Sequence, residues 1–225
     1  MVTPFSLSGP FQKPLSVTEA ALLYLREGWE ILPILSPAYE YFYFGRKRGR
    51  TPFYGSFEHP LRNEQTIRSW FTNHPQAGVG IKTGPGSGIF VLDIDRPDCD
   101  LPAFLDIPSL PPTRTVHSST GRKHLYFQYP REGVIHTVSG WQGIGCVLGI
   151  EHAYALAPPT LHSRGHSYMW EDFSVPVAPA PPALLALIQG LEPRYKQFTI
   201  GANPRKYVKG VLNTYIRNVI ALAGK

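Results

Sequence analysis

Two aspartates separated by one residue end a short apolar run near the middle of the chain. Residues 89–92 are apolar, and Asp93 and Asp95 follow them. Such a run after a Gly-rich turn predicts a short buried strand. Because side chains alternate along a strand, both carboxylates would project from one face, with Cα atoms about 7 Å apart. This arrangement favours a hard divalent cation such as Mg²⁺ or Mn²⁺. An ordinary strand end followed by an acidic turn is the alternative.

A second polar stretch contains the residue types that bind phosphate. Ser118, Ser119, Arg122 and Lys123 surround a glycine turn, and His124 begins the apolar segment that follows. Hydroxyls, backbone amides and cations this close together predict a phosphate-binding cradle. If the strand of His124 pairs beside the strand of the aspartates, its imidazole faces the same site. A purely structural role for a single histidine at a strand start is the alternative.

A basic cluster follows an aromatic segment in the first quarter of the chain. Arg46, Lys47, Arg48 and Arg50 come directly after residues 39–44, which are rich in Tyr and Phe. Aromatic rings can stack on bases while neighbouring cations bind phosphates, so this segment is a candidate nucleic-acid contact. A strand followed by a solvated basic loop explains the same pattern.

The elements that must position these residues can be read from local signals. A helix is predicted from Ser16 or Thr18, which can cap it, to Gly28, and a second helix over 63–74 with Asn63 as its cap. Alternating or continuous apolar patterns predict strands, and proline and glycine separate them. The strand patterns occupy residues 29–34, 78–84, 89–92, 124–127, 143–149, 153–157 and 168–170.

Composition predicts a folded protein with an anionic partner. Of the 225 residues, 43% are hydrophobic and only 17% are charged, with a formal net charge of +6. These values are typical of a globular domain and not of a disordered chain. The two cysteines match neither a disulfide framework nor a zinc site. No apolar run is long enough to span a membrane, and no signal-peptide pattern is present, so a cytoplasmic protein is expected.

Changes in composition predict the domain boundaries. Residues 1–14 are expected to form a loose arm, and residues 15–175 a compact domain. The proline-rich stretch 176–183 is predicted to be a linker. Residues 184–225 are predicted to be helical, with basic and apolar residues alternating at helical spacing over 205–223. This segment is expected to begin a longer C-terminal region.

Several of these segments, taken together over residues 17–172, resemble the bifunctional primase-polymerase domain of the archaeo-eukaryotic primase superfamily. The matching motifs occur in the correct order: a helical lead-in at 21–29 and 66–71, the first catalytic motif at 80–95, the Ser-rich and His-containing second motif at 118–127, and the ending strand-Pro-Pro-His-Gly-Tyr-x-Trp at 154–170. The resemblance identifies 15–175 as the catalytic domain. It implies an α+β fold in which an RRM-like antiparallel sheet packs with a second α/β layer.

The resemblance also implies an activity. It implies a template-dependent nucleotidyltransferase, a DNA primase and/or DNA polymerase, in the replication of plasmids, phages or other mobile elements. Asp93 and Asp95 would bind Mg²⁺ or Mn²⁺, and the phosphates of a nucleoside triphosphate would be bound by Ser118, Ser119, Arg122, Lys123 and His124. Single-stranded or primer-template DNA would be the second partner, with Arg46, Lys47, Arg48 and Arg50 guiding the template. A C-terminal helicase or primer-initiation domain is usual in such proteins.

One departure from the family pattern affects the metal site. The family places a third metal-binding carboxylate in the strand before the Pro-Pro motif, whereas this chain has Cys146 there. A neutral thiol is a poor ligand for Mg²⁺. Glu151 on the next turn could replace the acid, the site could use two carboxylates with a preference for Mn²⁺, or catalysis could be lost. Retained nucleotide transfer is expected because Asp93, Asp95 and His124 are all present. A non-catalytic nucleotide- or DNA-binding module and a metal-dependent nuclease are the alternatives.

Overall fold

The computed structural model describes residues 15–37, 50–53, 55–97, 99–119, 121–162 and 164–193. Four of the features predicted above lie outside these residues. They are the arm over 1–14, the aromatic segment 39–44, the basic residues Arg46, Lys47 and Arg48, and the helical pattern over 205–223.

The two predicted N-terminal helices are confirmed, together with their caps. Helix α1 (Val17–Arg26) begins with a capping box, in which Ser16 accepts from the backbone N–H of Glu19 and the Glu19 carboxylate accepts from Ser16. Helix α3 (Glu64–Asn73) begins at Asn63, whose side chain accepts from the backbone N–H of Thr66. Satisfying these first N–H groups fixes where each helix starts.

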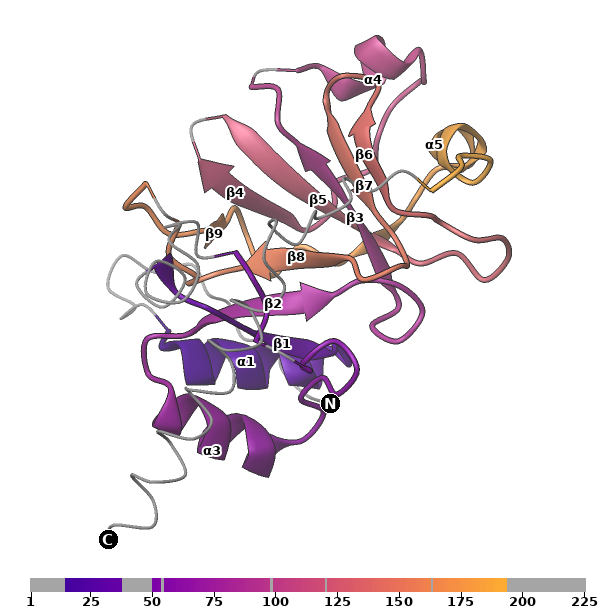
Figure 1. Ribbon diagram of the computed structural model, residues 1–225. Helices are drawn as coiled ribbons and strands as arrows, with labels where there is room; N and C mark the ends of the chain where they lie inside the picture. The colour runs from indigo at the N-terminus through magenta and orange to yellow at the C-terminus, as the bar shows by residue number, and fades with distance from the viewer. Residues whose placement is uncertain are drawn as a thin grey trace, which may run out of the picture.

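A small antiparallel sheet lies beside these helices. Its strands β1 (Ile31–Ile34), β2 (Gly78–Lys82) and β8 (Tyr154–Ala157) occur in the order β1-β2-β8. Every residue of β1 is buried. The sheet is covered on one side by α1 and α3, and the large sheet stands on its other side (Figure 1).

The large sheet is antiparallel except for one short pairing. Its strand order is β6-β7-β3-β5-β4-β9, and β10 pairs in parallel with β5. The bounds are β3 (Ile89–Ile94), β4 (Thr115–Ser119), β5 (Arg122–Gln128), β6 (Val138–Trp141), β7 (Gly145–Leu148), β9 (Met169–Trp170) and β10 (Ala178–Pro179). The α+β class predicted for the chain is therefore confirmed, with mostly antiparallel sheets and few helices.

The two faces of the large sheet belong to two apolar cores. Val91, Val116 and Tyr126 on the first face join the core of the small sheet and α1, where the Trp29 ring stacks on Tyr126 with centroids 5.8 Å apart. The second face, which includes Phe90, packs against α4 (Leu101–Leu105) and α5 (Pro182–Ile188). Because side chains alternate, the first face continues along β3 from Val91 to Asp93. On this first face of β3, the apolar core therefore ends at Val91 and the polar residues begin at Asp93.

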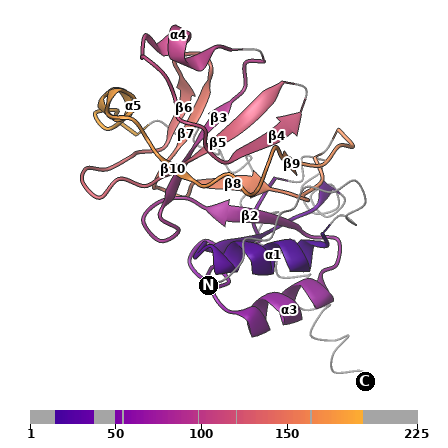
Figure 2. The same ribbon diagram turned by 180° about the vertical axis from the view of Figure 1, so that it is seen from behind.

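The proline-rich stretch predicted to be a linker contains ordered elements in the structure. Strand β10 and the start of α5 occupy it, and both are visible from behind in Figure 2. Pro182 stands in the first turn of α5, where a missing N–H costs nothing. Leu184 and Ile188 of α5 are fully buried in the second core. Neither α5 nor any other helix in the described residues is long and apolar enough to cross a membrane.

Candidate functional site

Asp93 belongs to β3, which is the middle one of three neighbouring strands. It runs between β5 and β7 (Figure 1). In the strand register, Asp93 is directly opposite His124 of β5 and Cys146 of β7. Directly opposed residues of antiparallel strands point to the same face. The carboxylate therefore has an imidazole on one side and a thiol on the other.

The contact between Asp93 and His124 joins a carboxylate to a nearly buried ring. Nε2 of His124 lies 3.4 Å from Oδ1 of Asp93, and His124 is only 5% exposed. Its Nδ1 atom is buried and has no hydrogen-bond partner among the described residues. Nε2 is therefore the atom that donates toward the carboxylate. The Tyr168 ring packs on the imidazole, with centroids 5.6 Å apart.

Asp95 has a separate partner on the same face. Nη1 of Arg122 lies 3.1 Å from its Oδ1 atom. Arg122 precedes His124 by two residues on β5, so both side chains project from one face. Each aspartate is thus opposed by a side chain of β5. The side chain of Asp95 is 53% exposed and that of Asp93 28%, so the pair faces solvent at the end of β3.

The charges around the aspartates determine their ionisation. Burial raises the pKa of the Asp93 carboxyl, but His124, Arg50 and Arg122 outweigh this effect and hold the pKa below its ordinary value. Asp93 is therefore ionised at neutral pH. Burial raises the pKa of the Cys146 thiol, and the two neighbouring carboxylates raise it further. Cys146 is therefore a protonated thiol at neutral pH.

Arg50 and the loop after β8 also reach the site, and sequence reasoning did not assign them to it. Arg50 was predicted to guide nucleic acid, but its charge lowers the pKa of Asp93. Its Nη2 atom lies 2.8 Å from Nε2 of His162. The ring of Tyr168, in the same loop as His162, packs between His124 and His162. The available signal was the ending motif at 154–170, which contains both His162 and Tyr168.

The donor set is suited to a hard divalent ion. Asp93 and Asp95 provide carboxylate oxygens on one face, which Mg²⁺ and Mn²⁺ prefer, and such ions take their remaining ligands from water and substrate phosphates. The part of the chain that the structure describes has no group of three or more His, Cys, Asp or Glu side chains arranged for a metal ion. The two aspartates are the described residues that could hold such an ion, together with water or phosphate oxygens.

Comparison with protein families agrees with this arrangement. The family described as "Bifunctional DNA primase/polymerase, N-terminal" matches residues 21–183, well over half of the chain. The chain belongs to this family. The matched region begins in α1 and ends in α5, so it includes both sheets and every residue of the candidate site. Comparison with curated proteins gives no match.

The structure separates Glu151 from the site of this primase/polymerase domain. In β7, Cys146 lies opposite Asp93 and Leu148 lies opposite Val91, and Glu151 lies three residues beyond Leu148. Its carboxylate contacts Nδ1 of His136 and accepts from the backbone N–H of Thr137 at 2.9 Å. Glu151 therefore lies toward the far end of β3. The prediction that it could replace the third acid is not supported by its position.

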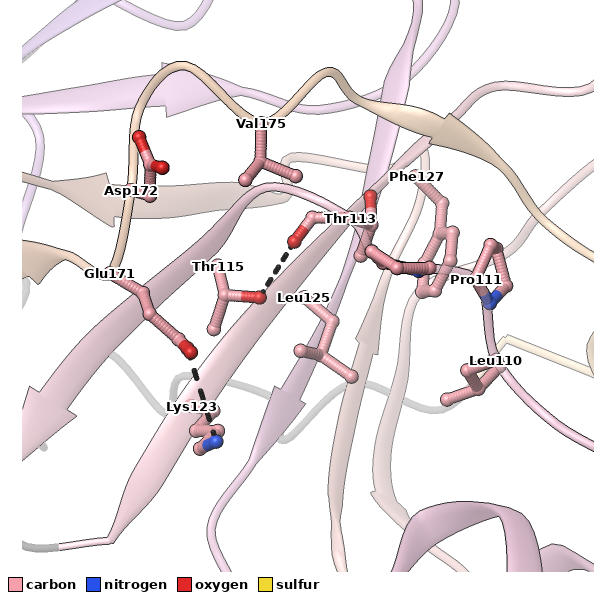
Figure 3. A pocket seen from close by; sticks show the side chains of 11 residues that line it. Leu110, Pro111, Thr113, Thr115, Lys123, Leu125, Phe127, Glu171, Asp172 and Val175 are labelled. Carbon is pink, nitrogen blue, oxygen red and sulfur yellow. Dashed lines mark hydrogen bonds and ion pairs between the residues drawn. The ribbon is translucent and has the colours of Figure 1, made fainter.

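Lys123 was predicted to bind phosphate together with His124, but the structure directs these neighbours to opposite faces. Consecutive side chains alternate along β5. Nζ of Lys123 lies 4.0 Å from the carboxylate of Glu171, and Lys123 lines a cavity of about 300 Å³ on the second face, beside Leu125 and Phe127 (Figure 3). Lys123 therefore does not join the aspartates.

The two serines of the predicted cradle have different positions relative to the site. Ser118 is 7% exposed, and its backbone carbonyl accepts from Nε2 of His166 at 3.1 Å. It thereby anchors the loop that contains His162. The side chain of Ser119 lies outside what the structure describes.

Proposed function

We propose that this chain is a template-dependent nucleotidyltransferase that acts as a DNA primase, a DNA polymerase or both. Membership of the bifunctional DNA primase/polymerase family supports the reaction class. The arrangement of Asp93 beside His124 and Asp95 beside Arg122 on one sheet face is the observation on which the proposal depends. We further propose that the large sheet is the RRM-like catalytic sheet of the family.

In this proposal Asp93 and Asp95 bind Mg²⁺ or Mn²⁺. The ion, when bound, lowers the pKa of the attacking 3′-hydroxyl and neutralises charge on the leaving pyrophosphate. The chain's own residues provide orientation and charge. His124 donates to Asp93 and fixes the direction of its carboxylate. Arg122 has five N–H donors, so it can contact Asp95 and still bind phosphate oxygens.

The partners follow from the same chemistry. Nucleoside triphosphates occupy the aspartate face, and single-stranded or primer-template DNA supplies the template. The net charge of +6 supports an anionic partner. We propose that Arg46, Lys47 and Arg48 contact the template. A helicase or primer-initiation domain following this region would complete a replication protein.

A catalytically weakened or inactive nucleotide- and DNA-binding module is the second candidate. Cys146 supports it, because a protonated thiol stands directly opposite Asp93, where the family motif provides a carboxylate. A metal-dependent nuclease could use the same two aspartates, and it leaves the cluster of cations beside them unexplained.

Primer extension with Mg²⁺ or with Mn²⁺ tests the proposal and separates these candidates. Extension of a primer on a single-stranded template supports nucleotide transfer, shortening of the primer supports the nuclease, and neither result supports the binding module. Asp93→Asn should reduce extension at least about 100-fold, because it removes charge from the reacting centre.

Asp106→Asn is the matched control for this substitution. Asp106 is an exposed acid with φ of 54° at the end of α4, a conformation that asparagine tolerates. The control should extend primers like the unaltered chain. Equal extension by the Asp93→Asn and Asp106→Asn variants would contradict the assignment of Asp93.

A further inference from the structure

The residue that directly follows the two aspartates is an exposed arginine, Arg96. The backbone N–H groups of Asp95 and Arg96 both donate to the carbonyl of Ile144, at 2.8 and 3.2 Å. The turn between β6 and β7 therefore fixes the backbone of Arg96 at the end of β3. Among the residues that the structure describes, the Arg96 guanidinium contacts an aromatic ring and forms no ion pair with a carboxylate.

The ring that Arg96 contacts belongs to Phe104 of α4. Cζ of Arg96 lies 5.5 Å from the ring centroid, within the distance at which a cation is attracted to an aromatic face. Leu101 and Leu105 of α4 are buried in the second core, whereas Phe104 is 42% exposed. The two leucines therefore hold α4 on the sheet, and the core does not require the Phe104 ring.

This exposed pair stands at the corner of the large sheet that also holds the aspartates. Helix α4 lies beyond the end of β3 in both views (Figures 1 and 2). A Cβ atom at Gly121 would lie 2.7 Å from Cβ of Pro97, so the turn before Arg122 packs directly on the residue after Arg96. Arg122 in turn contacts the carboxylate of Asp95. Arg96 and Arg122 thus occupy neighbouring turns beside the candidate site.

An exposed ring beside an unpaired guanidinium has the two binding functions that a single-stranded nucleic acid needs. A base can stack on the ring, and the guanidinium can bind phosphate oxygens through paired N–H donors. In a duplex the faces of the bases are covered by their neighbours, so the ring has no base to stack on. The net charge of +6 also favours an anionic strand. The pair formed by Arg96 and Phe104 is therefore suited to an unpaired strand.

We propose that Phe104 and Arg96 bind the unpaired template strand beside the two aspartates, Phe104 by stacking on a base and Arg96 by contacting a phosphate. The inference rests on the proposed function for the identity of the strand, because a template is unpaired where the next nucleotide is added. This contact is additional to the one proposed for Arg46, Lys47 and Arg48. It places a base-stacking group next to the reacting centre.

Equilibrium binding of a fluorescent single-stranded oligonucleotide to the full chain, without metal or nucleotide, tests this inference apart from catalysis. Phe104→Leu should weaken binding of the single strand by about fivefold or more, because a stacking face is lost. It should weaken binding of the corresponding duplex by about twofold or less, because the bases of a duplex stack on one another. Phe104→Trp retains an aromatic face and should bind the single strand within about twofold of the unaltered chain.

The salt dependence of binding separates the two roles. Arg96→Ala should weaken single-strand binding by about fivefold or more at about 50 mM salt, and it should reduce the slope of log K against log salt by about 0.7, the value for one phosphate contact. Phe104→Leu should leave this slope unchanged, because stacking releases no counterions. A role in folding alone would give neither pattern.

Arg131→Ala and Val134→Ala are the matched controls. Arg131 is exposed, and Val134 is 43% exposed. Both follow the last residue of β5, at the opposite end of the strand from Arg122. Arg131→Ala removes the same charge as Arg96→Ala, and Val134→Ala shortens an exposed apolar side chain. Both controls should bind the single strand like the unaltered chain.

Equal single-strand binding by the Phe104→Leu and Phe104→Trp variants would overturn the inference, as would equal losses for Arg96→Ala and Arg131→Ala. No measurable single-strand binding by the unaltered chain would overturn it too. The proposed function is measured separately, by primer extension. A chain that binds single strands in the predicted pattern but extends no primer supports this contact and contradicts nucleotide transfer. A chain that extends primers, and whose single-strand binding is unaffected by either substitution, contradicts this inference alone.

Discussion

At the scale of single residues, Cys146 is the position where the sequence predicted a departure from the family pattern. It lies opposite Asp93 in the register, so an aspartate there would place a third carboxylate oxygen donor beside the first two. Cys146→Asp should increase Mg²⁺-dependent primer extension by about tenfold, equivalent to about 1.4 kcal/mol of barrier. Without metal the same variant should melt at a lower temperature, because three adjacent carboxylates repel one another, and added Mg²⁺ should reverse this loss.

Cys146→Ser is the control for this substitution, because it preserves the size of the side chain and adds no charge. It should resemble the unaltered chain in both measurements. If the Asp and Ser variants extend primers at the same rate with Mg²⁺, position 146 is not a ligand position.

His162 predicts a pH dependence of stability. The folded chain holds the pKa of His162 near 4, whereas the ordinary value is 6.5. Between these pH values the unfolded chain binds a proton that the folded chain does not, so stability falls as the pH decreases across this window. The contribution is on the order of 2 kcal/mol. Urea unfolding at pH 7 and at pH 4.5 should show a smaller loss for His162→Gln than for the unaltered chain.

His59→Gln is the control, because it makes the same substitution at an exposed histidine. Its stability should fall between the two pH values as much as that of the unaltered chain. An undiminished loss in the His162→Gln variant would show that His162 is not the group responsible.

Sequence reasoning at the residue scale succeeded where the contact follows from local pattern. The D-x-D spacing placed Asp93 and Asp95 on one face, and the two strands did pair so that His124 faces Asp93. Lys123 was grouped with His124 because the two are adjacent in sequence, and adjacency in a strand is what separates their side chains. Arg50 could not be assigned, because its contact with His162 spans 112 residues and no local pattern encodes it.

At the scale of elements, Gly145 determines how closely β7 can approach β3. A Cβ atom at this position would lie 1.8 Å from the backbone oxygen of Asp93. Gly145→Ala should therefore destabilise the fold by at least about 3 kcal/mol, and it should reduce extension by displacing the backbone of Asp93. Gly190→Ala, where a Cβ meets open space, should cost less than about 1 kcal/mol. Chemical denaturation measures the free energy of unfolding of both variants. Similar losses would contradict the close approach of β7 to β3.

The elements themselves were more predictable than their arrangement. Ser16 and Asn63 identified two helix starts, because a cap depends on three or four consecutive residues. The pairing of β8 with β2 joins segments more than 70 residues apart in the chain, and many other pairings suit the same apolar patterns. The stretch 176–183 was interpreted as a linker because proline is common in linkers. Proline is equally suited to a short edge strand and a first helical turn, and the structure uses both.

At the scale of the whole molecule, a substitution in α5 can show whether this helix unfolds together with the rest of the domain. Leu184 is fully buried against the second face of the large sheet. Leu184→Ala should destabilise the entire domain by about 3 kcal/mol, in a single unfolding transition, because it leaves a cavity in the core. Leu15→Ala removes a leucine that is 42% exposed and should cost about 1 kcal/mol or less. Equal melting temperatures for the two variants would indicate that α5 lies outside the cooperative unit.

The groups around the aspartates come from both sheets. Asp93 and His124 belong to the large sheet, whereas His162 follows β8 of the small sheet and Arg50 lies near Pro52, which bridges to β1. A ligand that contacts Asp93 on the large sheet and the segment after β8 of the small sheet would link the two layers. Binding at this one site would therefore reduce the motion of one sheet relative to the other, and release of the ligand would restore that motion.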